Sequence, residues 1–209
     1  RQWGSKTPGH PEYGHTAGVD ASTGPLGHGF AMGVGFAVAE AMLAAKYNKP
    51  EFTVIDHYTY GLTSDGDLME GVASEAASLA GTLGLGKLIY LYDDNKITIE
   101  GSTDIAFTED VEARFKAYGW QVLRVADSED IEAMEAAVKE AQADTEHPSL
   151  IIVRTHIGYG SPKQDSASCH GEPLGAGALA LTKEKAGWPV GQPFYVPLTV
   201  SQYFKNKIE

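Results

Sequence analysis

An α/β fold, with a doubly wound and mostly parallel sheet and helices on both faces, is predicted by two features of the sequence. Short runs of apolar, β-branched and aromatic residues alternate with longer helical stretches, and no internal repeat of fixed period is present. Each strand-like run is followed by a helix, which is the order that produces parallel pairing and right-handed crossovers. Strands are expected near residues 58–64, 88–93, 120–125 and 149–155, and helices near 69–84, 110–118 and 130–143.

The first 29 residues are expected to form a functional loop, because seven glycines and three prolines leave no room for a regular element. A helix over residues 30–47 follows, apolar through most of its length and therefore expected to be buried. Gly33 and Gly35 lower its helix propensity but would let another backbone come close.

The later elements follow the same reasoning. The helix from Asp130 is clear because Ile131, Met134, Ala137 and Val138 fall on one face. A short extended piece is expected near 97–100, a second long polar loop over 156–175, and a helix near 176–186. We expect one domain over residues 1–187, followed by a proline-punctuated linker over residues 188–209.

The overall composition excludes several classes of protein. The chain has 209 residues, of which 43% are hydrophobic and 21% charged, as in an ordinary soluble globular protein. A formal net charge of -12 argues against nucleic acid or an anionic membrane as the main partner. The single cysteine, Cys169, excludes a disulfide within one chain and suits a reducing compartment. With no signal peptide and no apolar run of transmembrane length, we expect a cytoplasmic protein.

Polar residues follow two of the expected strands. Asp65-Gly66 ends the strand near 58–64, and Asp93-Asp94-Asn95 ends the strand near 88–93. The carboxyl edge of such a sheet is where ligands bind in open α/β folds. Asp carboxylate and Asn amide oxygens suit Mg²⁺ or Ca²⁺, and Mg²⁺ usually completes its octahedron with water and phosphate oxygens. These residues therefore indicate a metal-bridged phosphate site, although both segments could also be simple turns of a βαβ unit.

Asp-Gly, then 26 residues, then Asp-Asp-Asn resembles the diphosphate-binding motif of thiamine diphosphate enzymes, and the surrounding residues resemble transketolases in particular. The resemblance implies that Asp65, Asn95 and the carbonyl of Ile97 hold Mg²⁺ and that Gly66 contacts the cofactor. The family motif begins with Gly-Asp-Gly, whereas this chain has Ser64 in the first position. Serine tolerates a positive φ poorly, so either the backbone at Ser64 is ordinary or the loop is altered.

Two glycine-rich loops extend the resemblance. Gly24, Pro25 and Leu26 match the transketolase loop that contacts the aminopyrimidine end of the cofactor, and His10 matches a histidine placed against the reacting carbons of the sugar. In the second loop, His170 matches a histidine near both diphosphate and substrate, where an imidazole could move a proton as a C–C bond is made or cut. His10 and His170 are therefore the expected catalytic residues.

Two other segments are given roles by the same resemblance. Transketolases pack the helix that follows Asp65-Gly66 at a dimer interface, and small residues of this helix would permit a close approach there: Ala73, Ala76, Ala77, Ala80 and Gly81. Arg1 matches an arginine that contacts substrate. Cys169, which precedes His170 in the sequence, is not expected to be a nucleophile, because no base with an orienting partner stands beside it.

The resemblance implies a transketolase of the pentose phosphate pathway, which transfers a two-carbon glycolaldehyde unit from a ketose phosphate to an aldose phosphate with thiamine diphosphate and Mg²⁺. Residues 1–187 would be its diphosphate-binding domain, and residues 188–209 a linker toward a pyrimidine-binding domain. The site would be completed by that domain of the other subunit in a homodimer, so residues 1–209 alone are expected to be inactive.

Alternative readings remain open at this stage. Another thiamine diphosphate enzyme, such as dihydroxyacetone synthase or deoxyxylulose-phosphate synthase, would use the same metal and cofactor motif. A non-catalytic cofactor-binding subunit is a reading from a different class, supported only by Ser64. A generic nucleotide-binding domain is disfavoured because neither a Gly-x-Gly-x-x-Gly turn after a strand nor a Gly-Lys-Ser/Thr loop is present.

Overall fold

A computed structural model of the chain describes residue 4 and residues 9–208. Arg1, which the resemblance matches to an arginine that contacts substrate, lies outside the described residues. The chain divides into two compact units: the first holds residues up to 98 and 102–155, and the second holds residues 99–101 and 156 onward. The domain end expected at residue 187 stays a prediction.

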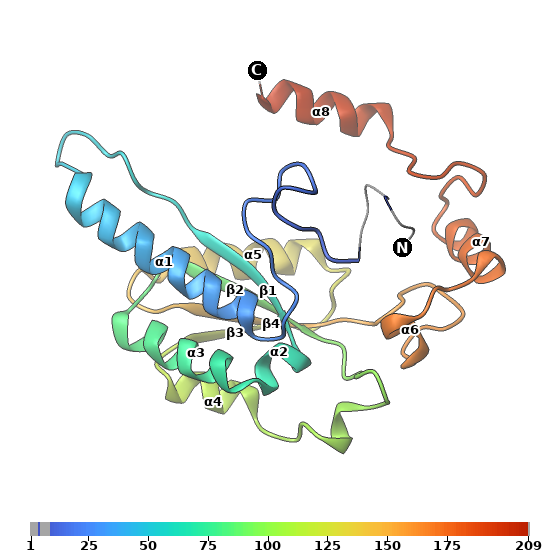
Figure 1. Cartoon of the computed structure of the whole chain (residues 1–209), viewed down its shortest axis with the longest axis horizontal. Coiled ribbons are helices and arrows are strands. Elements are labelled where there is room, and N and C mark those ends of the chain that lie inside the picture. The colour runs from blue at the N-terminus through green and yellow to red at the C-terminus, as the bar shows by residue number, and fades with distance from the viewer. Residues whose placement is uncertain (1–3, 5–8, 209) are drawn as a thin grey trace. The chain divides into compact units, whose positions relative to one another are not determined.

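Within the described residues of the first unit, four strands form one parallel sheet in the order β1-β2-β4-β3 (Figure 1). The predicted parallel sheet is confirmed, and each strand lies within one residue of its expected ends: β1 (Thr59–Ser64), β2 (Leu88–Asp94), β3 (Gln121–Val125) and β4 (Ser149–Arg154). Ser64 at the end of β1 is in register with Asp93 of β2. The residues that follow these strands therefore leave the sheet side by side.

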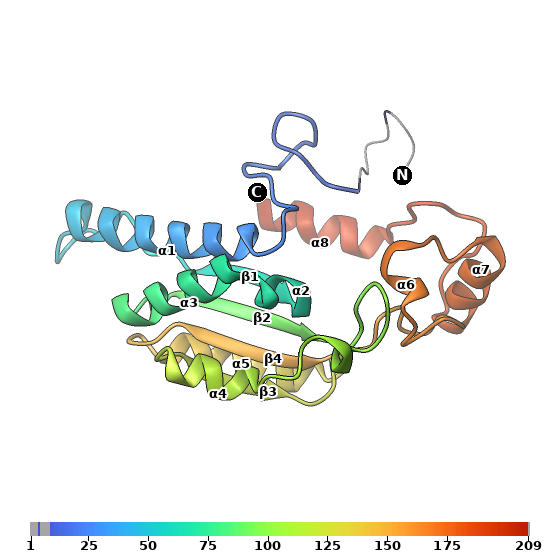
Figure 2. The same ribbon diagram turned by 60° about the horizontal axis from the view of Figure 1, so that its bottom comes forward.

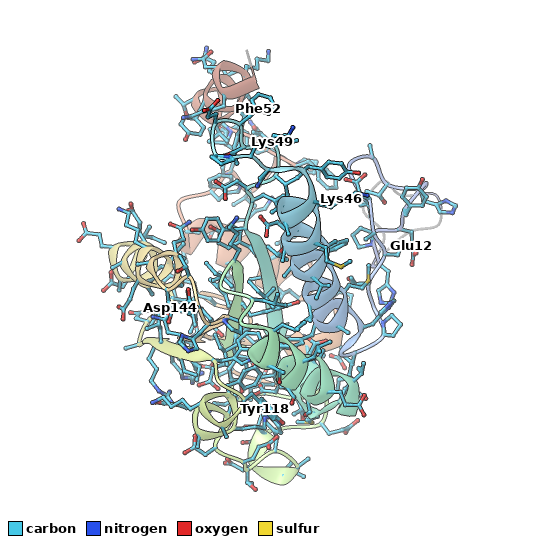
Figure 3. The ribbon with its side chains drawn as sticks, turned by 90° about the vertical axis from the view of Figure 1, so that its left-hand side faces the viewer. Glu12, Lys46, Lys49, Phe52, Tyr118 and Asp144 are labelled. Atoms are coloured by element: carbon cyan, nitrogen blue, oxygen red, sulfur yellow. The ribbon has the colours of Figure 1, made fainter. Side chains whose placement is uncertain are left out.

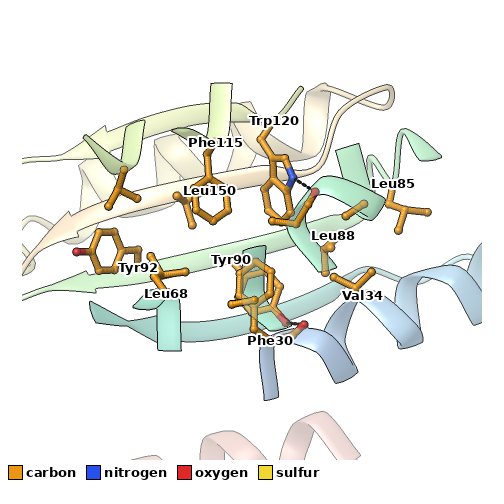
Figure 4. Packing of buried hydrophobic residues seen from close by; sticks show 14 of the residues in the cluster. Phe30, Val34, Leu68, Leu85, Leu88, Tyr90, Tyr92, Phe115, Trp120 and Leu150 are labelled. Atoms are coloured by element: carbon orange, nitrogen blue, oxygen red, sulfur yellow. Dashed lines mark hydrogen bonds between the residues drawn. The ribbon is translucent and has the colours of Figure 1, made fainter. Parts of the chain in front are cut away.

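One face of the sheet is covered by α1 (His28–Tyr47), α3 (Gly71–Leu83) and α4 (Val111–Ala117), whose buried side chains share one core cluster (Figure 2). Aromatic rings fill its centre (Figure 4). Phe30 stacks on Tyr90 with ring centroids 4.3 Å apart, and Phe115 meets Trp120 edge-on at 5.2 Å. The indole N–H of Trp120 donates to the carbonyl of Ala77 at 2.8 Å, so this buried polar atom is satisfied.

The opposite face is covered by α5 (Ile131–Ala143), as Figure 3 shows from the side. Ala137 and Ala141 of this helix pack with Ile89, Ile151 and Val153 of the central strands. Asp130 caps the helix by accepting a hydrogen bond from the backbone N–H of Ala133 at 2.9 Å. A doubly wound sheet with helices on both faces is therefore confirmed.

The helix expected over 69–84 is confirmed as α3, and a further short helix that was not expected precedes it. A short α2 (Asp65–Met69) begins directly after β1, and α3 begins two residues after α2 ends. Glu70 between them has an extended backbone, with φ -74° and ψ 137°, and serves as the C-cap of one helix and the N-cap of the next. Because α2 begins at Asp65, this residue lies in the first turn of a helix rather than in a loop.

The small residues of α3 lie inside the chain. Ala73, Ala77 and Ala80 are at most 2% exposed and belong to the core cluster. A Cβ on Gly81 would lie 1.8 Å from the backbone oxygen of Tyr118, which follows α4. The expectation that these four residues permit a close approach at a dimer interface was therefore wrong, because they serve packing within this chain.

The two glycines of α1 also differ from expectation. A Cβ on Gly33 would lie 2.0 Å from the phenol oxygen of Tyr90, so this glycine admits a side chain rather than another backbone. Gly35 is exposed, with no atom near the position of a Cβ. A close approach is present at Gly33, but it is made by the Tyr90 side chain and not by another backbone. At Gly35 no described residue comes close.

Within the described residues, α1 is the one helix that is long and apolar enough to cross a membrane by length and composition. Core helices of soluble proteins meet the same criterion, and Phe30, Val34 and Ala37 of α1 are buried against the sheet. The expectation that no apolar run reaches this length was wrong by this measure. Only 28% of this apolar stretch is buried, and Phe36, Met42 and Tyr47 are exposed, so the expectation that the whole helix is buried was wrong.

The second unit contains α6 (Ser168–Gly171), α7 (Ala176–Lys185) and α8 (Leu198–Ile208). The helix expected near 176–186 is confirmed as α7, whereas α8 lies in the segment expected to be a linker. Pro197 stands just before α8, where proline is compatible with a helix because the first N–H groups have no partner within it.

Two short segments before α4 also differ from expectation. A 3₁₀ turn at Thr103–Ile105 was not expected, and the extended piece expected near 97–100 forms only a single bridge, between Ile97 and Ser102.

Candidate functional site

The site begins with Asp65, the first residue of α2, which is buried with only 3% of its surface exposed. Its Oδ1 accepts a hydrogen bond from the hydroxyl of Tyr92 on β2. Its Oδ2 is buried and has no hydrogen-bond partner among the described residues. Asp65 also lines a pocket of about 120 Å³, together with Tyr92, Asp94 and Lys96.

Burial raises the pKa of the Asp65 carboxyl above its ordinary value. The hydrogen bond from Tyr92 opposes this shift, the nearby charge of Asp94 adds to it, and the ammonium of Lys96 lowers the pKa again. A buried carboxylate oxygen without a partner is costly unless a cation or donor meets it. The residues present therefore fit a divalent cation at this edge of the sheet.

Asn95 follows β2 at the same edge and is also buried. Its amide oxygen accepts a hydrogen bond from the backbone N–H of Ile97 at 2.8 Å, and its amide nitrogen donates to Asp93 at 3.2 Å. Lys96, between Asn95 and Ile97 in the sequence, has a positive φ of 65°, which turns the chain sharply. Its ammonium lies 2.6 Å from the carboxylate of Asp94. The turn fixes the orientation of the Asn95 side chain, one of the three expected ligands.

The loop that precedes α1 packs against the turn after β1. A Cβ on Gly66 would lie 3.4 Å from Leu26, so the Leu26 side chain lies over this glycine. Gly24 has a positive φ of 143°, and a Cβ there would lie 2.8 Å from the ring of His10. The structure thus brings together His10, Gly24, Leu26 and Gly66, four of the predicted site residues.

Ser64 has an extended backbone, with φ -133° and ψ 177°, so glycine is not required at this position. Its N–H and its hydroxyl both donate to Oδ2 of Asp67, at 3.1 and 3.2 Å. Oδ1 of Asp67 accepts from the backbone N–H of Gly27 at 3.0 Å. Asp67 therefore joins the two loops of the site. Sequence reasoning missed it, although the Ser-x-x-Asp spacing of a capping box was a usable signal.

Replacing Asp67 by alanine should loosen the loop around Gly27. The variant loses three hydrogen bonds to a charged acceptor, but their donors are only partly buried and can turn to water. The net loss is therefore set at about that of one such bond, roughly 1.5–3 kcal/mol. We expect faster amide hydrogen exchange over residues 22–29 and a free energy of unfolding lowered by about 2 kcal/mol. The result that would contradict this role is unchanged exchange in that loop, measured by mass spectrometry against wild type.

His170 belongs to α6 in the second unit and is exposed. The thiol of Cys169 beside it donates to the carbonyl of Lys163 at 3.0 Å and lies near the hydroxyls of Ser161 and Ser166. The expectation that Cys169 is not a nucleophile stays a prediction. His170 is held by local turns of its own unit, and its catalytic role stays a prediction.

Among residues 4 and 9–208, no group of three or more His, Cys, Asp or Glu residues is arranged to hold a metal ion. The expected ligand set contains only one such side chain, that of Asp65, beside an amide oxygen and a backbone carbonyl. The absence of an acidic or histidine cluster therefore leaves this ligand set untested.

Comparison with known proteins identifies the class of this fold and site. The family described as transketolase, thiamine diphosphate binding domain, matches residues 1–209. The transketolase of Geobacillus stearothermophilus is 57% identical over 210 residues, covering 100% of this chain and 31% of that protein. The transketolase of Bacillus subtilis is 56% identical over 205 residues, covering 98% of this chain and 31% of that protein.

Solved structures give the same result. A Pichia stipitis transketolase in complex with sedoheptulose-7-phosphate has a TM-score of 0.96 at 50% identity, and it is matched over 100% of this chain and 31% of its own. Transketolase from Leishmania mexicana has a TM-score of 0.95 at 46% identity, with the same coverage. The fold is thus that of a thiamine diphosphate-binding domain. The chain belongs to the transketolase family and spans about a third of the length of the relatives it matches.

Proposed function

We propose that the protein containing this chain is a transketolase that transfers a two-carbon glycolaldehyde unit from a ketose phosphate to an aldose phosphate, using thiamine diphosphate and Mg²⁺. The observation that carries the proposal is the buried, unpartnered Oδ2 of Asp65 at the carboxyl edge of the sheet. An oxygen in that state is stabilised by a cation or a hydrogen-bond donor, and this edge is the one where α/β folds bind ligands.

Three groups would hold the metal: Oδ2 of Asp65, the side-chain oxygen of Asn95 and the carbonyl of Ile97. Gly66 and the loop of Gly24, Pro25 and Leu26 would then contact the cofactor, and the Mg²⁺ ion would neutralise part of its diphosphate charge. When bound, thiamine diphosphate supplies the electron sink for making and breaking a C–C bond. The residues of this chain orient it and exclude water from one side.

His10 and His170 would act on the substrate, binding its oxygens and moving protons. Positioned acid–base groups of this kind contribute about 10²- to 10⁴-fold to rate. We expect His10→Ala and His170→Ala each to lower turnover at least about 100-fold while leaving the melting temperature nearly unchanged, since both side chains are exposed. His15→Ala, in the same N-terminal loop as His10, is the matched control and should retain turnover. A large loss of stability with turnover preserved would assign His10 and His170 structural roles instead.

The whole protein is proposed to act as a cytoplasmic homodimer in the pentose phosphate pathway, with the pyrimidine-binding domain of the other subunit completing each site. The reading as a non-catalytic subunit was supported only by Ser64. Because Ser64 has an extended backbone, the missing glycine no longer favours that reading.

A steady-state assay of the intact protein tests the proposed function. With xylulose 5-phosphate as donor and an aldose phosphate as acceptor, we expect turnover that requires both thiamine diphosphate and Mg²⁺ and is abolished by EDTA. If the protein binds thiamine diphosphate but transfers no two-carbon unit to any aldose phosphate, transketolase activity is excluded. Transfer to a different kind of acceptor would favour another thiamine diphosphate enzyme.

A further inference from the structure

Tyr92 is the residue that holds the candidate metal ligand in place. Its hydroxyl donates to Oδ1 of Asp65, and Oδ2 of the same carboxylate is the atom left without a partner. We propose that Tyr92 is a positioning residue, which fixes the Asp65 carboxylate so that Oδ2 faces the divalent cation. This inference rests on the proposed function.

The position of the Tyr92 ring is itself fixed. Tyr92 is 2% exposed and belongs to the core cluster that includes Leu68 and Ile152 (Figure 4). On β2 it is in register with Thr63 of β1, two residues before Asp65. A rigid strand therefore carries the donor, and a neighbouring strand end carries the acceptor. This arrangement holds the carboxylate before any ion binds, which is how outer groups commonly orient metal ligands.

Without the Tyr92 hydroxyl, neither oxygen of the Asp65 carboxylate would have a hydrogen-bond donor among the side chains that the structure describes. The carboxylate could then turn about its terminal bond, and binding of the cation would have to restrict that motion. Loss of an outer group that orients a ligand typically weakens metal affinity about 10- to 100-fold. The predicted defect is thus in cation affinity rather than in the chemical step.

The chain offers a matched control two residues earlier on the same strand. Tyr90 is also buried, its ring lies in the same cluster, and its hydroxyl donates to the carbonyl of Phe30 at 2.8 Å. Tyr90→Phe and Tyr92→Phe each remove one hydrogen-bonded phenol oxygen from the core and leave the ring in place. They differ in whether the lost hydrogen bond leads to Asp65.

The test is titration of the intact protein with Mn²⁺, followed by electron paramagnetic resonance at saturating thiamine diphosphate. We expect Tyr92→Phe to raise the Mn²⁺ dissociation constant about 10-fold and Tyr90→Phe to leave it within about twofold of wild type. Both variants should lower the melting temperature of the metal-free protein. In the turnover assay, Tyr92→Phe should need more Mg²⁺ for half-activation but recover wild-type kcat at saturating Mg²⁺.

Equal Mn²⁺ affinity in wild type and Tyr92→Phe would overturn the positioning role, as would an equal loss of affinity in Tyr90→Phe. If wild type binds neither Mn²⁺ nor thiamine diphosphate, the proposed function fails, and the role of Tyr92 fails with it. The behaviour of wild type therefore separates failure of the function from failure of this inference.

Discussion

Asp65→Asn is expected to abolish Mg²⁺-dependent binding of thiamine diphosphate while stabilising the metal-free protein. The amide keeps the size of the side chain and can still accept from Tyr92, but it removes a buried negative charge whose Oδ2 has no partner. Leaving a buried polar group unsatisfied costs about 1–3 kcal/mol, and more when it is charged. The amide NH2 would stay unpaired, so only the extra cost of the charge is removed, and we expect the free energy of unfolding to rise by about 1 kcal/mol. Calorimetric titration with the cofactor should give no Mg²⁺-dependent heat.

Asp110→Asn is the matched control for this variant. Asp110 lines the same pocket and carries the same charge, but it is exposed and already accepts a hydrogen bond from the N–H of Ala113 at the start of α4. Asparagine caps helices about as well as aspartate, so cofactor affinity and stability should both stay near wild type. Unchanged cofactor affinity in Asp65→Asn would remove Asp65 from the site.

Gly81→Ala is expected to cost about 3 kcal/mol of folding stability, at the upper end of the usual cost of overpacking a core. The added Cβ would lie 1.8 Å from the backbone oxygen of Tyr118 and 2.9 Å from its carbonyl carbon. Neither atom can rotate away as a side-chain tip could, so α3 must separate from the end of α4. This would disturb the cluster in which Phe115 and Trp120 pack.

Gly35→Ala in α1 is expected to stabilise the protein, whereas Gly81→Ala destabilises it. No atom lies within 4 Å of a Cβ built there, and the residue is an exposed helix position. Alanine should therefore stabilise the protein by about 0.5–1 kcal/mol through its higher helix propensity. Urea denaturation of both variants measures the difference. A denaturation midpoint of Gly81→Ala equal to wild type would show that α3 and the end of α4 are not in contact.

The strands could be predicted from the sequence because their signal is local. The apolar run Leu88–Tyr92, which ends at Asp93, is short and therefore typical of a buried strand. The other expected strands alternate with helical stretches at ordinary spacings. The break at Glu70 could not be predicted in the same way. Leu68, Met69 and Glu70 are all good helix formers, and the α2 turn is held partly by the bond between Asp67 and Gly27, 40 residues away in sequence.

The residues of the candidate site differ in the same way: some could be predicted from the local sequence, and others only from contacts in the structure. Asp65 and Asn95 were expected because each follows a strand, and the structure puts them at one edge of the sheet. Tyr92 and Asp67 were missed because their part depends on which side chain they meet across space. Tyr92 looks like an ordinary core aromatic in the sequence, and only the position of its hydroxyl on Asp65 distinguishes it from Tyr90.

The most direct test of the metal site is a crystal structure of the intact protein with thiamine diphosphate and Mn²⁺, recorded at a wavelength where manganese scatters anomalously. We predict one anomalous peak at bonding distance, about 2.1 Å, from Oδ2 of Asp65, with Asn95 and the Ile97 carbonyl as its other protein ligands. A peak coordinated elsewhere, or bound cofactor with no cation at Asp65, would contradict the account.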